Sequence, residues 1–149
     1  MQIATTHKNC DFDGLASVIA LTLLYPGTTA VIPKAVNPNV KAFLSMHKDI
    51  FETRLPVEID LDKVTSLLVA DVARWDRLDG LQSLREREDL AIRIWDHHPG
   101  QGDMDADTMC QESIGACITL LIRELQANHV AISPIQATLF LTGLYEDTG

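Results

Sequence analysis

Residues that could bind a metal ion stand together just after the first strand that the sequence predicts. A β-prone run at residues 2–6 leads directly into His7, and Asp11 and Asp13 follow before an apolar helical stretch. Carboxylates suit Mg²⁺ and Mn²⁺, and an added imidazole shifts the preference toward Mn²⁺, Fe²⁺, Co²⁺ or Zn²⁺. Taken alone, the two aspartates are explained more simply by an Asx-turn and a helix cap.

Two further predicted strands end in residues of the same kinds. One is followed by Asp71, and another by the triplet Asp96, His97 and His98. Asp71 alone would suit a helix N-cap, and a histidine pair alone is more often hydrogen-bonded or exposed than metallated. Because functional groups gather beyond the carboxyl ends of parallel strands, three such endings predict one shared crevice. Four or more aspartates would over-neutralise a single ion, so we predict a site for two divalent ions.

The elements that must position these residues alternate between strand and helix patterns. Strands are expected at residues 2–6, 29–33, 66–70 and 91–95. Helices are expected at residues 14–24, 40–47, 76–88, 113–128 and 133–144, and loops at 48–63 and 100–107. This order predicts an α/β fold, in which a mainly parallel β-sheet carries helices on both faces. Gly14 is expected to let the chain turn tightly into the first helix.

Composition and charge narrow the class of protein. A chain of 149 residues with 46% hydrophobic residues has the size and composition of one globular domain. Its formal net charge of −9 argues against a broad basic surface for polyanions. We find no secretory signal, no apolar run of membrane-spanning length and no CxxC spacing among the three cysteines. A cytoplasmic protein without membrane partners is therefore expected.

Four motifs resemble those of the DHH phosphoesterase superfamily and stand in the order that the family has them. They are HKNCDFDGLAS at residues 7–17, VAD at 69–71, WDHHP at 95–99 and GLYEDTG at 143–149. The segments DFDGLAS at residues 11–17 and LYPGTTAVIP at residues 24–33 are most similar to the sequences of one branch of the superfamily. In that branch a DHH domain is fused to CBS domains and a tRNA nucleotidyltransferase or poly(A) polymerase.

The resemblance implies roles for the polar residues of these motifs. The implied metal ligands are His7, Asp11, Asp13, Asp71, His97 and Asp147. His7 and Asp11 would bind one ion, Asp71 would bridge both ions, and the remaining three ligands would complete the second site. Asp71, Asp96 and His98 would be the catalytic residues: Asp96 would orient a histidine, and His98 would face the substrate phosphate. The ions would be Mn²⁺, with Mg²⁺ or Co²⁺ as alternatives.

The implied activity is a two-metal-dependent phosphoesterase that hydrolyses phosphodiester or phosphoanhydride bonds with metal-activated water. Its substrate would be a phosphorylated small molecule or short single-stranded nucleic acid, with a nucleotide or short oligonucleotide favoured. Two alternatives stay open. One is an exopolyphosphatase or pyrophosphatase activity, and the other is a nucleotide-sensing regulatory module of a fused nucleotidyltransferase or poly(A) polymerase.

The family also implies a partner domain. A second, smaller domain usually follows the fourth motif, closes over the metals and supplies basic residues for the substrate. The sequence stops at the end of that motif. We therefore expect residues 1–149 to be the DHH domain of a longer protein, weakly active without its C-terminal domains, and a homodimer is compatible with the sequence.

Overall fold

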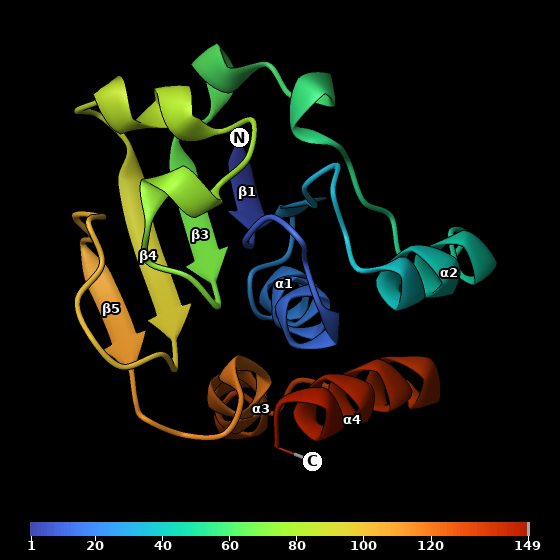
Figure 1. The fold of residues 1–149 in the computed structure, drawn as a ribbon. Helices are drawn as coiled ribbons and strands as arrows, with labels where there is room; N and C mark the ends of the chain where they lie inside the picture. Colours follow the sequence, from blue (N-terminus) through green and yellow to red (C-terminus); the bar gives the residue numbers. More distant parts are fainter. Residues whose placement is uncertain (149) are drawn as a thin grey trace.

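The computed structural model describes residues 1–148 and contains a five-stranded, wholly parallel β-sheet (Figure 1). The strands are β1 (Gln2–Thr5), β2 (Thr29–Val31), β3 (Ser66–Ala70), β4 (Ala91–Asp96) and β5 (Thr108–Gln111). They lie in the order β2-β1-β3-β4-β5, and every neighbouring pair is parallel. The α/β fold with a parallel sheet, expected from the sequence, is confirmed.

The four α-helices pack on one side of this sheet (Figure 1). They are α1 (Phe12–Leu24), α2 (Pro38–Met46), α3 (Cys117–Ala127) and α4 (Pro134–Thr148). α1 and α3 contact the strands, and α4 packs against α1 on the side away from the sheet. Short 3₁₀ helices in the connection between β3 and β4 cover the opposite face. Within residues 1–148 no helix combines the length and the apolar character that a membrane crossing requires.

Burial on both faces explains why the central strands are almost wholly apolar. In β3, Leu67 and Val69 belong to the core beneath the 3₁₀ helices, whereas Leu68 and Ala70 belong to the core beneath the α-helices. Successive side chains of a strand point to opposite faces, so a strand covered on both sides needs apolar residues at every position.

The segment after β3 corrects one expectation. Residues 76–88 were expected to form an α-helix, but they contain two 3₁₀ helices, η3 (Trp75–Arg77) and η4 (Gln82–Glu86). Leu78, Leu81 and Leu84 are buried at intervals of three along this segment. The backbone N–H of each donates to the carbonyl three residues earlier, which is the hydrogen-bond pattern of 3₁₀ turns and not that of an α-helix. Two further short helices, η1 (Pro56–Glu58) and η2 (Leu61–Lys63), occupy the segment expected to be a loop.

Three other boundaries differ from the expectation. The strand β5 follows the predicted loop at 100–107 and was missed, because it is short and mostly exposed. α3 starts at Cys117 rather than at residue 113, and α4 runs on to Thr148 rather than ending near residue 144. The last difference matters for the site, since it places Asp147 on a helix.

The strand order places a switch point between β1 and β3. From β1 the chain passes through α1 to β2 on one side, and from β3 it continues to β4 on the other. In open parallel sheets the loops that leave such neighbouring strands diverge and open a crevice beyond their carboxyl ends. His7 and Asp71 follow these two strands.

Candidate metal centre

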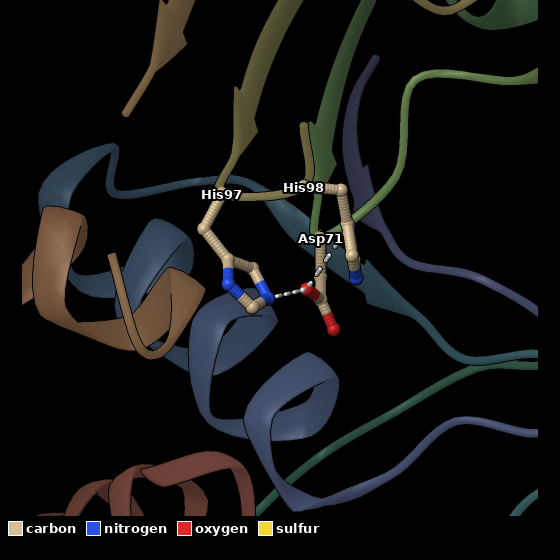
Figure 2. Close-up of side chains that lie close together, drawn as sticks. All are labelled: Asp71, His97 and His98. Atoms are coloured by element: carbon tan, nitrogen blue, oxygen red, sulfur yellow. Dashed lines mark ion pairs between the residues drawn. The ribbon is translucent and has the colours of Figure 1, made fainter. Parts of the chain in front are cut away.

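The ends of three strands bring their histidines and aspartates together, as the sequence predicted. Nε2 of His7 lies 3.0 Å from Oδ2 of Asp71, and Nε2 of His97 lies 3.0 Å from Oδ1 of Asp71. Figure 2 shows the side chains of His97 and His98 directed toward the Asp71 carboxylate. Asp71 therefore stands at the centre of the cluster, with a different histidine at each oxygen.

Asp71 adopts a backbone conformation that is uncommon for a residue with a side chain. Its φ is +66°, in the left-handed region, and its backbone N–H donates to the carbonyl of Trp95 at 2.8 Å. Such a conformation costs about 1–3 kcal/mol for a non-glycine residue and occurs mostly at functional sites. Here it ends β3 while the side chain remains only 2% exposed between the two histidines.

Asp13 connects the site to the start of α3. Its Oδ1 accepts from the backbone N–H of Ile118 at 2.8 Å, and its Oδ2 accepts from that of Cys117 at 3.0 Å. These N–H groups belong to the first turn of α3, where no intrahelical acceptor exists for them. Asp13 thus caps a helix that lies more than a hundred residues away in sequence, and its Oδ2 is 3.5 Å from Nε2 of His97.

Asp147 reaches the site because α4 crosses α1 closely. A Cβ atom on Gly143 would lie only 2.9 Å from the carbonyl oxygen of Phe12 and 3.2 Å from Cα of Asp13. Glu146 then accepts a hydrogen bond from the backbone N–H of Phe12 at 3.1 Å. With the helix fixed in this way, Oδ2 of Asp147 lies 3.4 Å from Nε2 of His97.

Gly14 allows α1 to pack closely against the end of β1, and it does not form a turn. It lies inside α1, and a Cβ atom there would be 2.8 Å from Oγ1 of Thr6. The expectation that Gly14 turns the chain is therefore wrong, because its missing side chain instead lets α1 approach the end of β1. Asp11 is the residue that begins the helix, since its carboxylate accepts from the Gly14 N–H at 2.9 Å.

Among the described residues, four sets of ligand-type residues place their ligand atoms within 4.8 Å of one another, and three of these sets include Asp71. Two of the four are Asp71, His97 and His98, and Asp11, Glu146 and Asp147; the other two are called the first and second ligand groups. The first group consists of His7, Asp11 and Asp71. The second group consists of Asp13, Asp71, His97 and Asp147. This division matches the two ligand sets that the resemblance implies, so each set could hold one cation.

The hydrogen bonding of the two histidines fits metal coordination. Nδ1 of His7 lies 2.8 Å from the carbonyl of Lys8, and Nδ1 of His97 lies 2.9 Å from that of Ile114. A carbonyl only accepts, so each Nδ1 carries a proton, and a ring that loses its second proton to a metal ion presents an unprotonated Nε2 to the site. Metal-binding histidines are usually oriented in this manner.

The pKa values of the metal-free cluster also indicate a site that could hold cations. Burial disfavours the charge of His7, but hydrogen bonds with Asp11 and Asp71 raise its pKa to about 10. The proximity of Asp71 raises the pKa of His97 to about 9. Burial and the charge of Asp71 raise the pKa of Asp13. Protons therefore occupy the positions that cations could fill, because buried carboxylates need nearby positive charge.

A cleft of about 270 Å³ opens over these residues, and His98 lines it. Oδ1 of Asp96 accepts from Nδ1 of His98 at 2.7 Å and from its backbone N–H at 3.2 Å. Asp96 is buried, so it fixes the ring and leaves Nε2 of His98 available to a ligand. Arg74 and Arg77 also line the cleft. Sequence reasoning missed both arginines and Glu146; the pair of arginines so soon after Asp71 was the available signal.

Comparisons with known proteins agree with this architecture. Residues 3–144 match the DHH family, N-terminal domain. The chain is 29% identical over 151 residues to an A-adding tRNA nucleotidyltransferase of Geobacter sulfurreducens, and 30% identical over 148 residues to one of Aquifex aeolicus. These alignments cover 100% and 99% of the chain, which spans only 17% of either relative. The expected resemblance to the fused branch is thereby confirmed.

A solved structure shares the fold. The crystal structure of an exopolyphosphatase-related protein from Bacteroides fragilis superposes with a TM-score of 0.79 at 17% sequence identity. The match covers 99% of this chain and 46% of that one.

Proposed function

The chain belongs to the DHH family, as its N-terminal domain, and from this premise we propose that it is a two-metal-dependent phosphoesterase domain. It would hydrolyse phosphodiester or phosphoanhydride bonds, with Mn²⁺ as the favoured ion. A nucleotide or a short oligonucleotide is the favoured substrate. The domain would act together with further domains of a longer protein.

One observation carries the proposal. Oδ1 of Asp71 and Nε2 of His97 are buried without hydrogen-bond partners, although they lie only 3.0 Å apart. An unpartnered buried polar atom is costly, and two that face one another are explained if both are ligands of one cation. His7, Asp11 and Asp71 would hold one ion, and Asp13, Asp71, His97 and Asp147 the other. When bound, such ions would polarise phosphoryl oxygens and lower the pKa of a water molecule.

The protein itself would contribute orientation and proton handling. His98 lies in the cleft with Nδ1 held by Asp96, so its Nε2 can donate to a phosphoryl or leaving-group oxygen when the ring is protonated. The buried Asp96 carboxylate accepts from Nδ1 of this ring and prevents it from rotating. His98 would act on the substrate, Asp96 would act through His98, and Asp71 would act through the cations.

A second function is favoured by the relatives. They are named for the addition of A residues to tRNA, and this chain spans 17% of their length. The domain could therefore sense a nucleotide and regulate a nucleotidyltransferase in the same polypeptide. Both functions require a site for a phosphorylated ligand, but only the phosphoesterase requires turnover.

The experiment that separates them is a hydrolysis assay on the purified protein. The 5′-phosphorylated dinucleotide pApA, inorganic polyphosphate and pyrophosphate would be compared in the presence of Mn²⁺ and in EDTA. We expect Mn²⁺-dependent release of AMP from pApA, which EDTA and the Asp71→Asn substitution both abolish. Asp79→Asn removes the same charge from an exposed position outside both ligand groups and should have no effect. Binding of pApA without any turnover would contradict the phosphoesterase and support the sensor.

A further inference from the structure

Arg77 is a cation at the edge of the candidate site that the family motifs do not include. It is exposed and lines the cleft, and its Nη2 lies 3.4 Å from Nδ1 of His7. Its backbone is fixed, because the carbonyl of Arg77 accepts from the N–H of Lys8 at 2.8 Å. The loops after β1 and β3 are thus joined at the position where the guanidinium enters the cleft.

The N–H donors of the Arg77 guanidinium lack a carboxylate partner in the described part of the chain. Among residues 1–148 no carboxylate lies within ion-pairing distance of it, whereas Nε of the neighbouring Arg74 pairs with Oδ1 of Asp76 at 3.0 Å. Nδ1 of His7 is not a suitable acceptor either, because its proton is donated to the carbonyl of Lys8. A cation in a strongly acidic protein that is left without a carboxylate, and that lines a cleft, is available to an anionic ligand.

Contacts across the site place Arg77 and His98 on different sides of the ligand groups. Arg77 lies next to His7, which contacts Oδ2 of Asp71. The other oxygen of Asp71, Oδ1, lies 3.9 Å from Nδ1 of His98. A phosphoryl group bound over Asp71 would therefore have an imidazole on one side and a guanidinium on the other.

We propose that Arg77 binds a phosphate group of the substrate on the His7 side of the cleft and determines specificity for phosphorylated ligands. This inference rests on the proposed function for the identity of the substrate. A guanidinium is suited to the role, because its planar fork donates two parallel hydrogen bonds to phosphate oxygens. Arg77 would supply positive charge from within this domain.

The alternative is that Arg77 only supports His7. Removal of the arginine would then disturb His7 and weaken metal binding. If Arg77 instead binds phosphate, its removal takes a positive charge away from the neighbourhood of the cations, so metal affinity should stay the same or rise slightly. The affinity for Mn²⁺ therefore separates the two roles.

Isothermal titration calorimetry on the full-length protein tests the proposal without relying on turnover. AMP and adenosine would be titrated at saturating Mn²⁺ into the wild type, Arg77→Ala and Arg77→Lys, and Mn²⁺ into the metal-free proteins. We expect Arg77→Ala to weaken AMP binding by about tenfold to a hundredfold, the typical effect of losing a charge-assisted hydrogen bond. Arg77→Lys should lose less, adenosine binding should not change, and Mn²⁺ affinity should be retained.

Arg85→Ala is the matched control. Arg85 comes from the same connection between β3 and β4, but it lies outside the cleft and faces Asp103. Equal AMP affinities for Arg77→Ala and Arg85→Ala would overturn the proposal, as would a loss of Mn²⁺ binding in Arg77→Ala. Failure of the proposed function would appear differently: the wild type would bind AMP through Arg77 yet hydrolyse none of the phosphoesters.

Discussion

Oδ1 of Asp71 and Nε2 of His97 lie 3.0 Å apart in the buried part of the site, yet neither atom makes a hydrogen bond. Nδ1 of His97 already donates to the carbonyl of Ile114, so the neutral ring has no second proton to offer to Asp71. Below its raised pKa of about 9 the metal-free ring carries a second proton in this space, and once that proton is lost two electron pairs face each other. A cation in that space would turn an unfavourable contact into two coordination bonds.

Addition of Mn²⁺ should therefore stabilise the protein, and Asp71→Asn should remove that stabilisation. A ligand at about 100 times its Kd adds about 2.7 kcal/mol to the free energy of unfolding. For a domain of this size, that corresponds to a rise in Tm of roughly 5 to 10 °C. Thermal unfolding followed by circular dichroism would measure it. Asp79→Asn, which removes a charge from an exposed position, should respond to Mn²⁺ as the wild type does.

The effect of Mn²⁺ should grow with pH. Without metal, the pKa values of His7 and His97 are raised to about 10 and about 9, and that of Asp13 is also raised. The native protein then binds more protons than the unfolded chain, so metal-free stability should fall as the pH rises above about 6.5 toward these values. Metal binding requires deprotonated ligands and releases these protons, so Mn²⁺ affinity should increase over the same range.

Paired melting curves with Mn²⁺ and with EDTA, taken between about pH 6.5 and 8.5, would test this linkage. The difference in Tm between the two conditions should widen steadily. Titration calorimetry in buffers of different ionisation enthalpy should also detect protons released on binding. A Tm difference that stays constant with pH would mean that the histidines are neutral before metal binds.

The residues at the strand ends could be located from the sequence because their positions depend on one rule of topology. His7, Asp71 and His97 each follow a strand of a parallel sheet, so their convergence needed no knowledge of side-chain packing. Glu146 and Arg77 could not be assigned in this way. Glu146 contacts a backbone N–H 134 positions away, and the place of Arg77 depends on a segment that was expected to be α-helical.

The boundaries of strands and helices could likewise be predicted where they depend on nearby residues, and not where they depend on residues distant in sequence. β3 was predicted to the residue, because an apolar run bounded by polar residues carries its own signal. The start of α3 was misplaced, because its cap is the side chain of Asp13, which lies in a different part of the sequence. No local pattern near residue 117 records that capping interaction.

Asp96→Asn should reduce turnover while leaving metal binding intact. Asp96 is absent from every candidate ligand set among the described residues, but its Oδ1 accepts two hydrogen bonds from His98. An amide presents an NH2 donor as well as an accepting oxygen, so it no longer holds the His98 ring in a single orientation. Replacing such an orienting residue typically costs about tenfold to a hundredfold in activity. Steady-state hydrolysis of pApA should show the loss in kcat. Mn²⁺ affinity should stay close to that of the wild type, because Asp96 belongs to none of the candidate ligand sets. A large loss of Mn²⁺ affinity would instead assign Asp96 to the metal ligands.

Gly143→Ala should destabilise the protein and weaken its response to Mn²⁺, although alanine is the better helix former. At an exposed helical position the change would add about 1 kcal/mol of stability. Here the new methyl group would lie 2.9 Å from the Phe12 carbonyl oxygen and 3.1 Å from Cβ of Ala16, so α4 must move away from α1. Overpacking of this kind costs about 1–3 kcal/mol. The shift would also carry Asp147 away from His97.

Chemical denaturation would measure the free energy of unfolding. Leu141→Ala, at a position 54% exposed on the same helix, should change it by less than about 0.5 kcal/mol. A more stable Gly143→Ala protein with an undiminished Mn²⁺ response would show that the contact between α1 and α4 does not position Asp147.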